Sequence, residues 1–118
     1  MAIGDNKVKF LFTSRGWVPP AEMRKLALRL IKLIGMTPAR NHLVDDYPYQ
    51  GGGGNGYTLF QPLMESYIVV DVYYDQNETE ILISTCMPDR FEVNTVLEFL
   101  EQELGPTVGG KGDFGILG

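Results

Sequence analysis

Apolar and polar residues alternate at the start of the chain. Val8, Phe10 and Phe12 recur at every second position between Lys7 and Thr13. A period of two places these side chains on one face of a strand. We therefore predict a first strand with one buried face.

A helical period follows this strand. Pro19 and Pro20 suit the first turn of a helix, because the N–H that proline lacks has no partner there. From Ala21 to Ile34 apolar residues recur every three or four positions, and Gly35 is a typical residue for the end of a helix. We predict an amphipathic helix with a buried stripe of Met23, Leu26, Leu30, Leu33 and Ile34.

The middle of the chain is rich in β-prone residues. Four more strands are predicted, at residues 36–44 (which include His42), 57–63, 67–74 and 80–85. Residues 45–56 contain four consecutive glycines and are expected to form a loop. Because no GK[ST] sequence or helix follows, a lid or linker is favoured over a phosphate-binding loop.

The last third of the chain predicts a second helix. Pro88-Asp89 is typical of a helix start and Gly105-Pro106 of a helix end. The glycine-rich tail from residue 109 is expected to fray, and its Asp113-Phe114-Gly115 matches a kinase motif by chance. The apolar stripe of this helix is Val93, Val96, Leu97, Leu100 and Leu104.

The order of these elements predicts one domain over residues 1–118. A strand, a helix, four strands and a helix favour an α+β fold, a two-layer sandwich with an antiparallel β-sheet and both helices packed on one face. The other face would carry Tyr67, Val69, Asp71 and Tyr73, or their neighbours, and needs solvent or a partner. We expect a homodimer through that face.

Charge and composition limit the classes of molecule that the protein is expected to bind. The net charge is −5, from 15 acidic and 10 basic residues, which argues against a nucleic acid or an anionic membrane as partner. No apolar run reaches the roughly 18 residues of a membrane span, and the N-terminus lacks the regions of a signal peptide. The single cysteine forms no intrachain disulfide. These features predict a soluble, cytoplasmic protein without a zinc site.

Several candidate catalytic residues are expected to lie close together at one end of two neighbouring strands, here called the corner of the sheet. Ser66 begins one predicted strand and Cys86 ends the next. If these strands pair antiparallel, the first residue of one lies near the last residue of the other. A hydroxyl, a thiol and the carboxylates of Glu65 and Asp71 would then converge at one end of the sheet.

The residues of this corner resemble the prokaryotic S-adenosylmethionine decarboxylases. That family has a Glu-Ser-His, a second histidine, a Trp-Pro-Glu and a later Thr-Cys-Gly. Here Glu65-Ser66-Tyr67 and Thr85-Cys86 stand at the spacing of the family pattern. The resemblance covers roughly residues 56 to 104, and the family fold is also a two-layer sandwich that dimerises.

The resemblance implies a self-processed enzyme. Ser66 would attack the carbonyl of Glu65, the chain would be cut between them, and Ser66 would become a pyruvoyl cofactor. This group is an electron sink for loss of CO₂ from a small amine or amino-acid substrate. Cys86 would be the proton donor, and Thr58 would supply a hydroxyl used in processing. The substrate would be S-adenosylmethionine, ornithine or arginine, in polyamine biosynthesis.

The chain also departs from the family pattern. The second histidine is Asp71 here, which could act as the processing base only if partial burial made its carboxyl basic enough. The histidine after the serine is Tyr67, and the Trp-Pro-Glu is Tyr73-Tyr74-Asp75. Tyr67, Tyr73 and Asp75 would bind substrate, with Tyr73 on an adenine ring and Asp75 on a ribose hydroxyl. Alternatively, Asp71 and Asp75 would attract a cationic substrate.

A second hypothesis remains open at this point. The chain could be an unprocessed, non-catalytic homologue that keeps the fold and binds a small ligand or a protein partner. Loss of the second histidine favours this hypothesis, whereas the retention of Ser66, Cys86 and Thr58 favours the enzyme.

Overall fold

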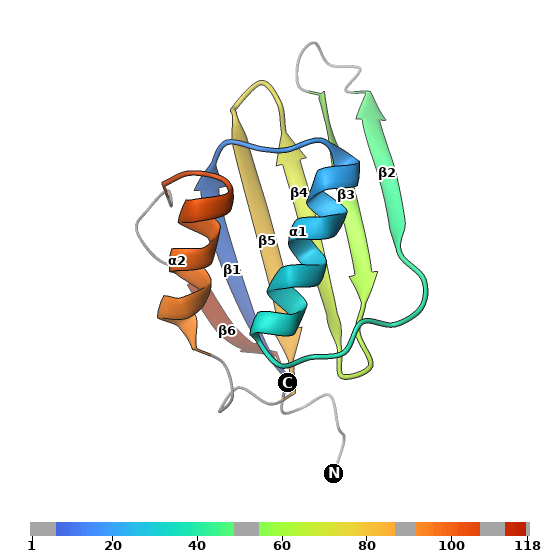
Figure 1. Ribbon diagram of the computed structural model, residues 1–118, viewed down its shortest axis with the longest axis vertical. Coiled ribbons are helices and arrows are strands. Elements are labelled where there is room, and N and C mark those ends of the chain that lie inside the picture. Colours follow the sequence, from blue (N-terminus) through green and yellow to red (C-terminus); the bar gives the residue numbers. More distant parts are fainter. Residues whose placement is uncertain (1–6, 49–54, 87–91, 107–112, 118) are drawn as a thin grey trace.

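The computed structural model describes residues 7–48, 55–86, 92–106 and 113–117, and these form six strands and two helices (Figure 1). In chain order the elements are β1 (Lys7–Arg15), α1 (Pro20–Leu33), β2 (Leu43–Pro48), β3 (Asn55–Pro62), β4 (Tyr67–Tyr73), β5 (Glu78–Thr85), α2 (Val93–Glu103) and β6 (Asp113–Leu117).

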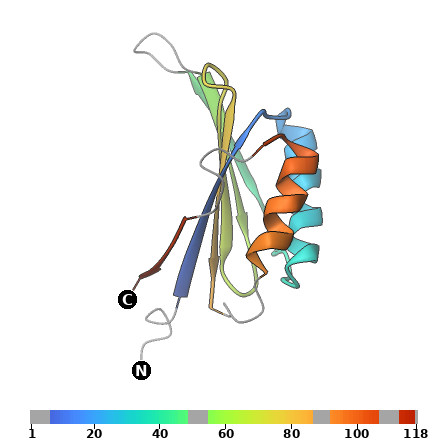
Figure 2. The same cartoon turned by 90° about the vertical axis from the view of Figure 1, so that its left-hand side faces the viewer.

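All six strands belong to one antiparallel sheet in the order β2-β3-β4-β5-β1-β6. The first strand of the chain therefore lies inside the sheet, between β5 and β6. Both helices cover the same face of the sheet, and the part of the chain that the structure describes places no helix on the other face, here called the open face (Figure 2). The predicted α+β two-layer sandwich is confirmed.

The ends of α1 follow from its prolines and glycine. Pro19 is extended and precedes the first helical residue, Pro20. At the other end Gly35 adopts a φ of 73°, which a glycine reaches without a steric penalty. The Gly35 and Met36 amides then donate to the carbonyls of Lys32 and Ile31, at 3.1 and 3.0 Å. This Schellman arrangement satisfies carbonyls that the helix end would otherwise leave unpaired.

The core lies between the helices and the sheet. On β4 the residues Ile68, Val70 and Val72 are buried against the helices, while the alternate residues face the open side. The predicted assignment of Tyr67, Val69, Asp71 and Tyr73 to the open face is confirmed by this pattern.

One member of the predicted α1 stripe is wrong. Leu33 is 45% exposed, whereas Ala27 and Ile31 are buried. The buried side chains of α1 recur at spacings of three and four residues, and Leu33 lies outside the stripe that they form. They are Met23, Leu26, Ala27, Leu30 and Ile31.

The second strand is displaced from its predicted position. The structure has β2 at Leu43–Pro48 rather than at residues 36–44, so His42 precedes the strand, and much of the predicted loop 45–56 is strand. Asp45 and Asp46 have low β propensity, but their backbones pair with Thr58 and Tyr57 of β3. Pairing with a neighbouring strand outweighs local propensity here. The glycines at 51–54 lie outside the described residues.

The glycine-rich tail was expected to fray, but part of it forms β6. Its backbone pairs with β1, with Phe114 opposite Phe10. This pairing satisfies the outer hydrogen-bonding edge of β1, a gain that the composition of the tail does not reveal. The predicted helix start at Pro88-Asp89 lies outside the described residues, and α2 begins at Val93.

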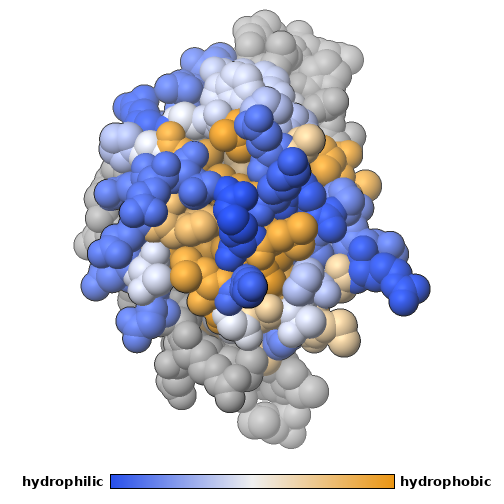
Figure 3. All heavy atoms as spheres, in the orientation of Figure 1, coloured by the Kyte–Doolittle hydropathy of each residue, from blue (hydrophilic) through white to orange (hydrophobic). Residues whose placement is uncertain are grey.

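The helix layer presents mostly hydrophilic side chains to solvent, with apolar side chains visible between them (Figure 3). Arg29 of α1 donates to the carboxylate of Glu103 of α2 and links the two helices. Within the described residues, neither helix is long and apolar enough to cross a membrane.

Candidate active site

The predicted cleavage position lies in a tight turn between β3 and β4. Pro62, the last residue of β3, pairs with Tyr67, the first residue of β4. The Leu63 amide then donates to the carbonyl of Ser66 at 2.9 Å, so Met64 and Glu65 form the tip of the hairpin. The Glu65–Ser66 peptide bond is therefore part of a short, ordered turn.

The turn is tied to the segment that follows α1. The Met64 amide donates to the Thr37 carbonyl at 2.9 Å. In return, the Thr37 amide donates to Oε1 of Glu65 at 3.1 Å. These two bonds fix the turn and direct the Glu65 carboxylate toward Thr37.

Cys86 contacts the residue that precedes Ser66. Its Sγ lies 3.7 Å from the carbonyl oxygen of Glu65, in a geometry that lets the thiol donate to that oxygen. Cys86 directly follows β5, which pairs with β4, so the ends of the two strands meet as the sequence indicates. The structure thus brings together Glu65, Ser66 and Cys86.

Ser84 is a fourth member of this corner, and the sequence did not single it out. Ser66 Oγ donates to Ser84 Oγ at 2.8 Å. Ser84 lies on β5, opposite Tyr67 of β4 and Lys9 of β1, and is fully buried. No motif marks this serine, and the only available signal was its strand register.

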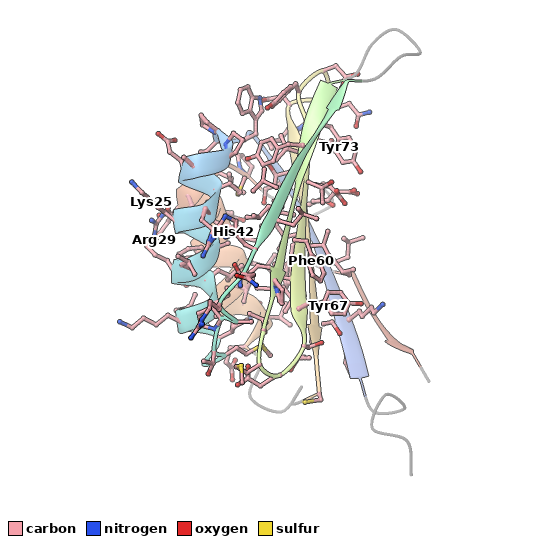
Figure 4. All side chains as sticks on the ribbon, turned by 90° about the vertical axis from the view of Figure 1, so that its right-hand side faces the viewer. Lys25, Arg29, His42, Phe60, Tyr67 and Tyr73 are labelled. Carbon is pink, nitrogen blue, oxygen red and sulfur yellow. The ribbon has the colours of Figure 1, made fainter. Side chains whose placement is uncertain are left out.

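Tyr67 covers the open-face side of the corner. Its ring lies 5.8 Å from the ring of Phe60, and Lys9 Nζ lies 5.5 Å from its centroid. Figure 4 shows Phe60, Tyr67 and Tyr73 on the sheet face that points away from α1. A substrate that approached Ser66 from this face would meet Tyr67.

Asp71 and Thr58 lie away from Ser66, which contradicts the expected convergence of Asp71 with this corner. Thr58 donates to Oδ1 of Asp71 across the β3–β4 pair. Asp71 is four residues beyond Tyr67, and a strand rises about 3.3 Å per residue, which gives roughly 13 Å. Because β4 is extended, Asp71 cannot also lie at the end of the strand beside Ser66, whatever the family pattern implies.

The other predicted substrate residues lie farther still. Tyr73 donates to Oε1 of Glu80 at 3.0 Å and is six residues, or roughly 20 Å, from Tyr67. Asp75 is exposed in the turn between β4 and β5. Within one chain, Tyr73 and Asp75 are therefore at the opposite end of β4 from Ser66.

His42 is also remote from the corner. Its Nδ1 contacts the guanidinium of Arg24, beside α1 (Figure 4). Among the described residues, no three His, Cys, Asp or Glu side chains are grouped closely enough to hold a metal ion.

Comparison with known proteins adds no assignment to this geometry. No family model, no curated protein and no solved structure matches the chain.

Proposed function

We propose that the chain is a pyruvoyl-dependent amino-acid decarboxylase that cuts its own backbone between Glu65 and Ser66. The observation that carries the proposal is the contact of the Cys86 thiol with the Glu65 carbonyl oxygen. A donor at this oxygen makes the carbonyl carbon more electrophilic and stabilises negative charge that develops during attack. The hydroxyl of Ser66 is the adjacent nucleophile.

The first step converts an amide into an ester. Ser66 Oγ adds to the carbonyl carbon of Glu65, the C–N bond breaks, and the nitrogen of Ser66 gains a proton and becomes an amine. The hydroxyl of Ser66 already donates to Ser84 Oγ, so its proton is directed toward a neighbouring acceptor. Ser84 and Cys86 thus act on the nucleophile and the electrophile respectively.

The second step forms the cofactor. A base removes the α-proton of Ser66, the Cβ–Oγ bond breaks, and Glu65 leaves with a free carboxylate. Water then hydrolyses the resulting dehydroalanine. Its nitrogen leaves as ammonia, and a pyruvoyl group remains at the start of the second chain. The pyruvoyl carbonyl supplies the electron sink for loss of CO₂ from a substrate amine. Cys86 would donate the proton that replaces CO₂ on the substrate carbon.

The sheet supports such a cut without unfolding. The N-terminal fragment would keep β1 to β3 and the C-terminal fragment β4 to β6. β3 remains paired with β4, and β1 with both β5 and β6. The two fragments would stay together until a denaturant separates them.

The substrate class follows from the resemblance and the acidic side chains near the open face. S-adenosylmethionine, ornithine and arginine are all amino acids that carry a positive charge besides the α-amine. Asp71 and Glu80 neighbour each other on β4 and β5 and add negative charge to the open face, which favours the approach of such a cation without binding it at Ser66. A place in polyamine biosynthesis fits these substrates.

The test is self-cleavage of the purified protein. Wild-type protein should give two bands on a denaturing gel, and the C-terminal fragment should react with a carbonyl reagent. Ser66→Ala should give one band. The control is Ser14→Ala, because Ser14 is a buried serine of β1 that pairs with Thr79, at the end of β1 far from the Ser66 turn. A wild-type chain that stays intact would overturn the proposal.

An unprocessed homologue is the second candidate, and one observation favours it. Asp71, which replaces the family's processing histidine, is hydrogen-bonded to Thr58 rather than to Ser66. A protein of this kind would bind a small ligand or a protein partner with the same sheet face. The two candidates differ on the gel, because only the first predicts a wild-type doublet that Ser66→Ala abolishes.

A further inference from the structure

A short segment after α1 runs beside the turn that carries the cleavage position (Figure 1). It consists of residues 37–41 and is here called the strap; it belongs to the connection between α1 and β2. Three backbone contacts join the strap to the turn. They are the Ala39 amide with the Pro62 carbonyl and the Met64 amide with the Thr37 carbonyl, both at 2.9 Å, and an antiparallel bridge between Pro38 and Leu63.

Gln61 of β3 holds the strap from inside the protein. Its side chain is fully buried, and its Nε2 donates to the carbonyls of Ala39, Asn41 and Pro62 at 3.3, 3.5 and 2.7 Å. Its Oε1 is buried and has no hydrogen-bond partner among the described residues. Because an unpaired buried acceptor carries a free-energy cost, the orientation of this amide is set by the carbonyls that it donates to. Two of these carbonyls belong to the strap.

The strap also reaches the residue that precedes the cleavage position. The Thr37 amide donates to Oε1 of Glu65 at 3.1 Å, and the carbonyl oxygen of Glu65 lies 3.7 Å from Cys86 Sγ. The side chain and the carbonyl of Glu65 are thus held by two different elements, the strap and the residue that follows β5. Neither the position of Glu65 nor the direction of its carbonyl is then free.

We propose that the strap positions the Glu65–Ser66 peptide bond for cleavage, and that Gln61 and the carboxylate of Glu65 are positioning residues that act through it. This inference rests on the proposed function. Attack of a hydroxyl on a carbonyl carbon depends steeply on their orientation, and a displacement of about 1 Å can cost about a hundredfold in rate. The Ser66 hydroxyl itself donates to Ser84, so the strap acts on the electrophile, through the backbone of the turn.

The strap lies on the N-terminal side of the cut. The residues that hold it, Gln61 to Glu65, belong to the same fragment as the strap, so separation of Glu65 from Ser66 breaks none of these contacts. The new carboxyl end would therefore stay in the corner, and the freedom gained by the cut would fall to the chain that begins at residue 66.

The test replaces the Glu65 side chain and follows self-cleavage of freshly refolded chain on denaturing gels. Glu65→Ala removes the acceptor of the Thr37 amide and should slow cleavage at least about tenfold. Glu65→Gln keeps an Oε1 acceptor and should restore most of the rate. Thr37→Ala is the matched control, because Thr37 acts through its backbone amide and its side chain is exposed. Equal rates for Glu65→Ala and Thr37→Ala would overturn the proposal.

A second variant tests the inner attachment. Gln61→Met removes both N–H donors at a similar side-chain length and should slow cleavage as well. The Ala39 amide should exchange with solvent at least about tenfold faster in this variant, because the strap is less firmly held. Faster exchange with unchanged cleavage would show that the strap does not position the peptide bond. The Glu65 variants decide the question if Gln61→Met fails to fold.

The inference and the proposed function fail in different ways. A wild-type chain that stays intact would overturn self-cleavage, whereas wild-type rates in Glu65→Ala would overturn the role of the strap alone. The contact itself can be tested in the uncut Ser66→Ala chain. There the Thr37 amide should exchange at least about threefold more slowly than in Ser66→Ala combined with Glu65→Ala. Equal exchange would contradict the proposed hold on Glu65.

Discussion

Cys86 Sγ lies 3.7 Å from the carbonyl oxygen of Glu65, so the end of β5 contacts the peptide bond that precedes Ser66. The contact depends on the pairing of β4 with β5, which places Ser84 opposite Tyr67 and leaves Cys86 two residues farther along. A thiol, a carbonyl and a hydroxyl are thereby held together by the backbone of the sheet.

Replacement of Cys86 should slow self-cleavage. Cys86→Ala removes the donor to the Glu65 carbonyl, and loss of one such donor should slow cleavage about a hundredfold. Cys86→Ser keeps a donor and should be slowed less. The rate can be measured on denaturing gels after rapid refolding of freshly made chain. Equal rates for Cys86→Ala and wild type would remove Cys86 from the cleavage step.

Replacement of Ser84 should also slow self-cleavage, through Ser66. Ser84→Ala removes the acceptor of the Ser66 hydroxyl, and loss of a hydrogen bond of this kind should slow cleavage about tenfold. Ser84→Thr keeps the hydroxyl and should restore most of the rate. Ser14→Ala is the control, since the buried Ser14 hydroxyl makes no hydrogen bond among the described residues. A rate for Ser84→Ala that equals the control would exclude this role.

Tyr57 should make stability fall at alkaline pH. Its phenol is buried and donates to the carbonyl of Val18, and burial, with Tyr74 and Glu22 nearby, raises the pKa of Tyr57. The folded state therefore holds this proton more tightly than the unfolded state. The resulting stability is complete below the usual tyrosine pKa of about 10 and decreases as pH rises above it.

Urea unfolding of Tyr57→Phe checks this account. The variant loses the hydrogen bond to Val18, which should cost about 1–2 kcal/mol near neutral pH. Its stability should then fall less steeply than that of the wild type above about pH 10, because the ionising group is gone. Parallel curves for the two proteins would contradict the role of Tyr57.

The sequence predicted elements with a strong period and missed elements that depend on pairing. The alternation at Val8, Phe10 and Phe12 and the spacing from Met23 to Leu30 both describe real elements, because burial of one face is a local property of the pattern. β2 was misplaced and β6 was missed, because Asp45 and the glycines near Phe114 carry no such period. Their strands exist through hydrogen bonds to β3 and β1.

The corner was predictable only in part for a similar reason. Antiparallel pairing of two strong strands was enough to bring Cys86 to Glu65. Ser84 was missed because its importance depends on which residue of β5 lies opposite Tyr67, and register is set by the whole sheet. Asp71 was misplaced because spacing borrowed from a family pattern ignored the length of an extended strand.

Self-cleavage between Glu65 and Ser66 is tested most directly by the intact mass of the purified protein in denaturant. Two chains are expected: residues 1–65 with a free carboxylate, and residues 66–118, which begin with a pyruvoyl group and resist N-terminal sequencing. A single species at 13.2 kDa that persists for days at several pH values would contradict it.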